Sequence, residues 1–170
     1  MQIWQQAVAF AARQHREQMR GDGRTPYIAH PVRVALTILT LFQNDDPEVI
    51  AAALLHDVLE KTGATCDELA AQFGSRVAMM VAKLSKDSRW PHEEAEQTYF
   101  EQLRAADWQT RLVKLADVYD NLCDAGADRA RRRKKAEQSL VLAVENEPPM
   151  RLAREILTKA IAEAPTASES

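Results

Sequence analysis

Residues 47 to 61, PEVIAAALLHDVLEK, combine an almost entirely apolar helical run with three polar side chains that lie close together. At 3.6 residues per turn, His56, Asp57 and Glu60 share a sector of roughly 100°, and apolar side chains cover the rest of the helix. A helix this apolar is expected to be buried by other parts of the chain. A buried carboxylate or imidazole costs several kcal/mol unless it is paired, hydrogen-bonded or bound to a metal ion. Partners for these three residues must therefore come from elsewhere in the sequence.

The pattern of the whole chain favours an all-α fold. Gly and Pro are scarce among the 170 residues, and the breaks between helical segments are short, which predicts a bundle of about seven to nine helices. Pro31 is placed as the first residue of a helix, and TCDEL indicates a capping box between Thr65 and Glu68. The helices are expected at residues 2–19, 31–42, 47–61, 65–74, 75–86, 92–105, 107–123, 128–145 and 148–163. We expect one domain over residues 1–164 and a disordered tail over 165–170.

Composition and charge exclude several classes of partner. A formal net charge of -3 and a pI near 5.8 give no overall attraction to nucleic acid or to an anionic membrane. No apolar run approaches membrane-spanning length, and two cysteines outside any CxxC spacing suit a reducing cytosol. We therefore expect a cytoplasmic protein without nucleic-acid or membrane partners, for which a homodimer is one assembly left open.

The basic run RARRRKK, residues 129–135, is the one candidate for a nucleic-acid patch. It has no interleaved aromatic residues and carries carboxylates nearby, which is more typical of an ordinary charged helix. A place near the mouth of an active site, or a subunit contact, are the other interpretations left open for it.

Four histidines are present in the chain, and His30 is the best placed to join His56. It lies at an expected helix cap in TPYIAHP, where the end of a loop can present the imidazole inward. His15 and His92 lie in more polar surroundings.

A second carboxylate comes from RLVKLADVYDNL, in which Lys114, Asp117 and Asn121 share the helix face opposite a core stripe. Two imidazoles and two carboxylates make a mixed nitrogen and oxygen set suited to Mn²⁺, Fe²⁺ or Zn²⁺, with positions left for water and substrate. Simpler interpretations exist: Asp117 and Asn121 on a solvated face, His30 as a cap only, and a buried hydrogen-bonded pair at residues 56–57. These simpler interpretations account for the pattern only if all of them hold at once. The metal site, which explains all of the residues together, is therefore favoured.

The order His30, His56-Asp57 and Asp117, all on helices, resembles the HD-domain metal-dependent phosphohydrolase superfamily. Within it the chain is similar to the hydrolase domain of the RelA/SpoT family, especially the stand-alone form typified by the metazoan SpoT homologue. The matching stretches, within about residues 4 to 125, are TPYIAHPVRVA, AALLHDVLE, FGSRVAMMVAKLSKD and KLADVYDNL. The resemblance implies an HD-domain helical bundle and Mn²⁺-dependent hydrolysis of the 3′-diphosphate of (p)ppGpp to GDP or GTP and pyrophosphate. Some stand-alone members are also described as NADPH 2′-phosphatases.

The same resemblance implies roles for individual residues. Glu60 and Asn121 would act on water and on the scissile phosphate, and the metal ligands would be His30, His56, Asp57 and Asp117. Glu60 lies one turn from His56, in position to orient or deprotonate a water molecule.

The remaining anionic groups of a nucleotide need cations. Arg20 and Arg24 flank a glycine-containing loop before His30, and Lys114 lies one turn before Asp117, so all three are candidate substrate-binding residues. Arg20 could instead stack on the purine, because a planar guanidinium does this well.

One position departs from the family pattern. The motif usually runs His-Asp-x-x-Glu-Asp, and here its last position is Lys61. If Lys61 faces the reacting phosphate, it favours binding of an anion, and activity on the alarmone is weakened or redirected. The milder interpretation is a helix end that points to solvent, where a cation is favoured. Two alternatives therefore stand beside alarmone hydrolysis: a phosphatase for NADPH or a nucleoside monophosphate, and a nucleotide-binding regulatory module without turnover.

Overall fold

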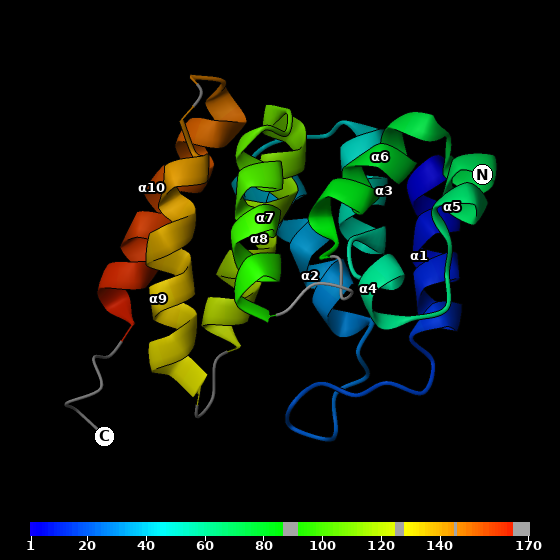
Figure 1. Ribbon diagram of the computed structural model, residues 1–170, viewed down its shortest axis with the longest axis horizontal. Coiled ribbons are helices and arrows are strands. Elements are labelled where there is room, and N and C mark those ends of the chain that lie inside the picture. The colour runs from blue at the N-terminus through cyan, green and yellow to red at the C-terminus, as the bar shows by residue number, and fades with distance from the viewer. Residues whose placement is uncertain (87–91, 125–127, 145, 165–170) are drawn as a thin grey trace.

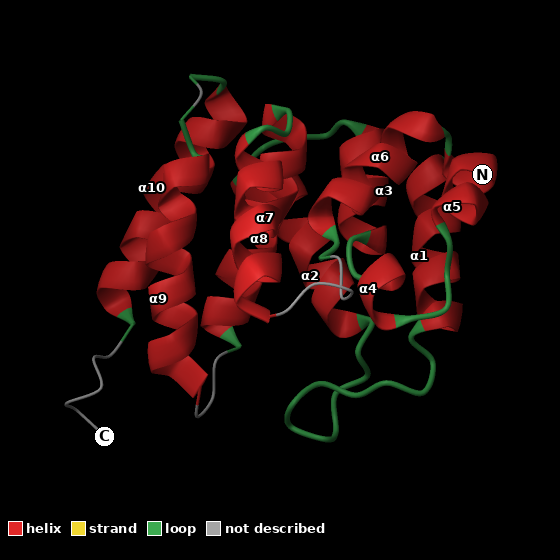
Figure 2. Cartoon of the chain, viewed as in Figure 1, coloured by secondary structure: helices red, strands yellow, loops and turns green. Residues whose placement is uncertain are grey.

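The computed structural model describes residues 1–86, 92–124, 128–144 and 146–164 of the chain. In these ranges the regular elements are all helices (Figures 1 and 2), so the predicted all-α class is confirmed. No described helix is both long enough and apolar enough to cross a membrane. The tail expected to be disordered, 165–170, lies outside the described residues.

The helices follow one another along the chain and share one core. Figure 1 shows α1 and α5 at one end of the molecule and α9 and α10 at the other. A continuous cluster of buried apolar side chains extends from Ala7 to Ile161. The elements are α1 (Ile3–Gln14), α2 (Ala29–Leu36), η1 (a π-helical turn, Thr37–Leu41), α3 (Pro47–Leu55), α4 (Val58–Lys61), α5 (Cys66–Phe73), α6 (Ser75–Leu84), α7 (His92–Arg104), α8 (Trp108–Cys123), α9 (Arg129–Ser139), η3 (a 3₁₀ turn, Leu140–Leu142) and α10 (Pro148–Glu163).

Helix α3 is buried, as its sequence predicts. Asp46 caps it by accepting a hydrogen bond from the Glu48 N–H at 2.9 Å, and Pro47 is its first residue. Every residue from Val49 to Leu55 is buried. The capping box of α5 is confirmed as well, since Thr65 and Glu68 each accept from the backbone N–H of the other.

The single helix expected over 47–61 is wrong, because the chain breaks at His56 and Asp57 into α3 and α4. His56 Nδ1 donates to the Ala53 carbonyl at 2.7 Å and so takes up a backbone acceptor near the end of α3. The break carries the two polar residues out of the regular helix and into the wall of a pocket.

The first helix was expected to reach residue 19, but α1 ends at Gln14. After it the Gln18 N–H donates to the His15 carbonyl at 3.0 Å in a turn, and a loop, residues 18–27, then folds back on itself. The Arg20 N–H donates to the Thr25 carbonyl at 2.8 Å, and the Tyr27 N–H donates to the Gln18 carbonyl at 2.9 Å. This loop places Arg20 and Tyr27 at the pocket.

Two other helix boundaries differ from the expected ones. Helix α2 begins at Ala29, so His30 lies in its first turn and is not a cap before Pro31. Pro31 is tolerated in the first turn because the N–H groups there have no intrahelical hydrogen-bond partner. Proline has no backbone N–H, so no hydrogen bond is lost. The helix expected over 128–145 ends at Ser139, where a tighter 3₁₀ turn follows.

Candidate metal centre

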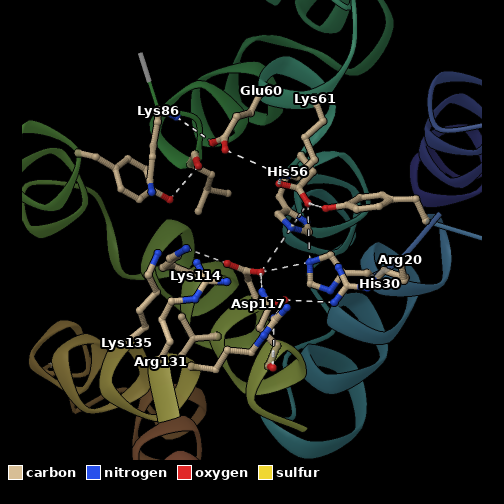
Figure 3. A pocket seen from close by; sticks show the side chains of 17 residues that line it. Arg20, His30, His56, Glu60, Lys61, Lys86, Lys114, Asp117, Arg131 and Lys135 are labelled. Atoms are coloured by element: carbon tan, nitrogen blue, oxygen red, sulfur yellow. Dashed lines mark hydrogen bonds and ion pairs between the residues drawn. The ribbon is translucent and has the colours of Figure 1, made fainter. Parts of the chain in front are cut away.

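All four predicted metal ligands meet at one place. His30 comes from α2, His56 from the break between α3 and α4, and Asp117 from α8 (Figure 3). Asp57 follows His56 in the same break. The ligand atoms of His30, His56 and Asp117 lie within 4.8 Å of one another. Asp57 Oδ2 lies 3.7 Å from His30 Nε2 and 3.3 Å from His56 Nε2.

The outer nitrogen of each imidazole is held by an acceptor. His30 Nδ1 donates to Asp120 Oδ2 at 2.6 Å, and His56 Nδ1 donates to the Ala53 carbonyl. Both Nε2 atoms are therefore left to face the carboxylates, and His56 Nε2 is buried without a hydrogen-bond partner in the described part of the chain. Imidazoles oriented in this way are characteristic of metal ligands, so the donor set fits a divalent ion.

The electrostatics of the cluster lead to the same conclusion. Burial lowers the pKa of His56, but the Asp57 and Asp117 carboxylates outweigh it and raise that pKa to about 9. Burial raises the pKa of Asp57, yet the neighbouring imidazole of His56 outweighs it and holds that pKa well below its usual range. The cluster thus favours a positive charge at its centre, which either a proton or a metal ion can supply.

Asp117 is fixed through both of its oxygens. Lys114 Nζ donates to Oδ2 at 2.7 Å, and Asn121 Nδ2 donates to Oδ1 at 2.6 Å. Burial lowers the pKa of Lys114, but Asp117 outweighs it, so the ammonium stays charged. Lys114 and Asn121, expected to contact substrate, therefore also orient the carboxylate.

Asp57 is held by a residue that the sequence did not single out. The Tyr27 hydroxyl donates to Asp57 Oδ2 at 2.5 Å, and Tyr27 packs on His15 with ring centroids 4.8 Å apart. His15 is a buried residue, and its Nδ1 lies 2.8 Å from Gln18 Oε1. The side chain of His92 lies outside the described part of the structure.

A pocket of about 370 Å³ opens beside the donors. Glu60 and Lys61 line it, with Lys61 Nζ 3.9 Å from Glu60 Oε1 and 4.0 Å from Asp57 Oδ1. Lys61 therefore borders the pocket, and its side chain, which is 36% exposed, also reaches solvent. Glu60 Oε2 accepts from the Lys86 N–H at 3.1 Å.

Of the two arginines predicted to bind substrate, one lines the pocket and the other does not. Arg20 lines the pocket, donates to Asp124 at 2.9 Å and lies 5.5 Å above the Tyr27 ring. Arg24 does not line it, and its backbone N–H donates to Asp22 in the loop.

Residues that the sequence left unassigned complete the wall. They are Tyr27, Leu84, Lys86, Tyr99, Val118, Arg131, Arg132 and Lys135. Three of them belong to the basic run 129–135, so this run borders the pocket, which agrees with one of the interpretations left open. The spacing of Arg131 and Lys135, one helical turn apart, is the signal that could have identified them.

Residues 7–142 match the family model described as HD domain. The chain belongs to the HD domain family. The guanosine-3′,5′-bis(diphosphate) 3′-pyrophosphohydrolase MESH1 of Danio rerio is 42% identical over 120 residues, which cover 70% of this chain and 67% of that protein. The protein of the same name from Homo sapiens is 41% identical over 120 residues, which again cover 70% of this chain and 67% of that protein.

A solved structure has a similar fold. It is that of a metazoan ortholog of SpoT that hydrolyzes ppGpp, and it matches this HD domain chain with a TM-score of 0.81 and 26% identity. The match covers 94% of this chain and 96% of that one. The predicted resemblance to the metazoan SpoT homologue is confirmed.

Proposed function

We propose that this protein is a metal-dependent phosphohydrolase that converts guanosine-3′,5′-bis(diphosphate) (ppGpp) to GDP and pyrophosphate. The observation that carries the proposal is the joining of His30, His56, Asp57 and Asp117 beside a pocket lined with lysines and arginines. The names of the relatives from Danio rerio and Homo sapiens specify this reaction for those proteins and support the choice of substrate. Mn²⁺ is our proposed ion, and Fe²⁺ or Zn²⁺ are alternatives for the same donors.

The chemistry that such an ion supplies when bound is polarisation of a phosphoryl oxygen and activation of a water molecule. Glu60 orients that water and accepts its proton, and the Lys86 N–H fixes its carboxylate. Asn121 has one amide N–H engaged with Asp117, and its second N–H donates to a phosphate oxygen. Arg20, Lys61 and Lys114 offset the charge of the substrate.

Other features of the protein remain predictions. Residues 1–164 are proposed to act as a single hydrolase domain, which the continuous buried cluster from Ala7 to Ile161 supports. Arg24 is proposed to reach the substrate when loop 18–27 closes. A cytoplasmic location and a homodimer stay as expected from the sequence, and light scattering of the purified protein tests the second.

The test is a substrate screen with purified protein loaded with Mn²⁺. We expect GDP and pyrophosphate from ppGpp, the corresponding products from pppGpp, and no turnover after chelation of the metal. Turnover of only NADPH or nucleoside monophosphates would overturn the choice of substrate. Nucleotide binding without any turnover would identify a regulatory module instead.

A further inference from the structure

Three charged residues stand just behind the pocket, where α2 packs on α8. They are Arg33 on α2, Asp120 on α8 and Asp124, which ends α8, and none of them lines the pocket. Arg33 follows His30 by one helical turn, and Asp120 follows Asp117 by one helical turn. The two helices that supply these metal donors therefore also bring an arginine and two carboxylates together.

Asp120 is a buried carboxylate with donors at both of its oxygens. His30 Nδ1 donates to Oδ2 at 2.6 Å, while Arg33 donates from Nε to Oδ1 at 2.6 Å and from Nη2 to Oδ2 at 3.0 Å. The carboxylate cannot turn without breaking this two-pronged pair, so Arg33 fixes the acceptor that sets the ring orientation of His30. His56 differs, because its acceptor is a backbone carbonyl that needs no support from another side chain.

Arg33 also reaches the second carboxylate. Its Nη2 donates to Asp124 Oδ2 at 2.9 Å, and the same oxygen accepts from Arg20 Nε at 3.1 Å and from Arg20 Nη2 at 2.9 Å. No hydrogen bond joins Arg20 Nη1 to any residue that the structure describes. Asp124 thus holds one edge of this guanidinium, which lines the pocket, and leaves the other edge for an anion.

We propose that Arg33 is a positioning residue for both halves of the site. Through Asp120 it orients the metal ligand His30. Through Asp124 it turns the outer edge of Arg20 toward an anionic ligand. The second role rests on the proposed function, whereas the first requires only that the donors bind a metal ion. Lysine cannot fill this place, because an ammonium lacks the planar fork that spans two carboxylates.

The test separates the two roles with four variants. Asp120→Asn removes the charge that Arg33 holds against His30, Asp124→Asn removes the one that it holds against Arg20, and Arg33→Gln and Arg33→Lys disturb both. Two quantities are measured: the affinity of the metal-free protein for Mn²⁺ by calorimetry, and KM and kcat for ppGpp at saturating Mn²⁺. Urea unfolding of each metal-free variant reports its stability.

Arg76→Gln is the matched control. Arg76 on α6 pairs with two carboxylates, Asp46 and Glu48, in the same way as Arg33 does. Its side chain is 41% exposed against 38% for Arg33, and it does not line the pocket. This variant therefore loses a bridge of the same kind without touching either half of the site.

We expect Asp120→Asn to weaken Mn²⁺ binding by about 10- to 100-fold with KM close to that of the parent. Asp124→Asn should raise KM roughly tenfold, the scale of one charge-assisted contact, with unchanged Mn²⁺ affinity. Arg33→Gln should show both losses, and Arg33→Lys should not restore them. Arg76→Gln should match the parent in both quantities, even where its stability falls as much as that of Arg33→Gln.

Parental Mn²⁺ affinity and KM in Arg33→Gln would overturn the proposal, and a loss of only one would show that Arg33 does not serve both halves. Equal losses in Arg76→Gln would overturn it too, because they would follow from stability alone. Should the parent not hydrolyse ppGpp, the affinity for this nucleotide replaces KM, and its loss in Arg33→Gln supports the proposal although the hydrolase activity has failed. A parent that binds no ppGpp overturns the second role, and the Mn²⁺ affinities then decide the first.

Discussion

Asp57 and Glu60 are carboxylates one turn apart that stand in different surroundings. The Asp57 side chain is 14% exposed, touches both imidazoles and accepts from Tyr27, whereas that of Glu60 is 32% exposed at the pocket wall. Burial among imidazole nitrogens suits a metal ligand, and access to the pocket suits a group that handles water.

Glu60→Gln should separate these two roles. The amide keeps the size of the side chain but loses the base, so kcat should fall by about 10²-fold while metal content and substrate affinity are retained. Metal analysis and steady-state kinetics on ppGpp measure both. An unchanged kcat would assign the water to another group.

Lys61 adds a positive charge where the family pattern has an acid, 3.9 Å from Glu60 Oε1. Lys61→Asp should raise kcat on ppGpp and weaken ground-state binding, with the larger binding loss at low salt, where a local charge is least screened. Lys61→Ala is the matched control for loss of charge alone. If both variants reproduce the kcat and KM of the parent, Lys61 has no part in the reaction.

Three of the four candidate metal ligands stand out in the sequence because each is an unusual residue for its helix. His56 and Asp57 interrupt an apolar run, and Asp117 faces away from a core stripe. Tyr27 and Asp120 could not be found in this way. Their contacts to Asp57 and His30 join segments 30 and 90 residues apart, and tyrosine or aspartate near a helix is ordinary in either setting.

Loop 18–27 braces the break between α3 and α4. Tyr27 donates to Asp57, and Gln18 Nε2 donates to the Lys61 carbonyl at 2.7 Å, so the loop holds α4 at both of its ends. The sequence predicted a glycine-containing loop before His30, but neither its packing on α4 nor the break between α3 and α4, because both depend on these distant partners. The capping box of α5 was predictable, since its donors and acceptors lie within four residues.

Tyr27→Phe should weaken Mn²⁺ binding by about 10- to 100-fold, the usual effect of removing a group that orients a metal ligand. The hydroxyl is lost while the ring packing on His15 remains. Tyr119→Phe on α8, away from the pocket lining, is the matched control. A metal affinity equal to that of the parent would show that Asp57 is oriented without Tyr27.

The stability of the whole molecule should depend on what occupies the cluster. In the metal-free protein the pKa of His56 is about 9, above its unfolded value of 6.5. Its protonation therefore stabilises the fold fully below pH 6.5, and this contribution is lost as pH rises toward 9.

The expected loss in the free energy of unfolding is roughly 3 kcal/mol across that window, at about 1.4 kcal/mol per pKa unit. Urea unfolding of the metal-free protein between pH 6.5 and 9 measures it, and the Mn²⁺-loaded protein is the control, because the ion replaces the proton. A metal-free protein with constant stability over this range would contradict the account.

The proposed reaction depends on a divalent ion held by residues from α2, the α3–α4 break and α8. Metal content and ppGpp turnover, determined on the same preparations of the parent and of Asp57→Ala, test it most directly. We predict one bound ion and GDP release for the parent, and neither for a folded Asp57→Ala protein that melts at a lower temperature because the ion no longer stabilises it. Full metal occupancy in Asp57→Ala, or ppGpp hydrolysis by it at the rate of the parent, would contradict the account.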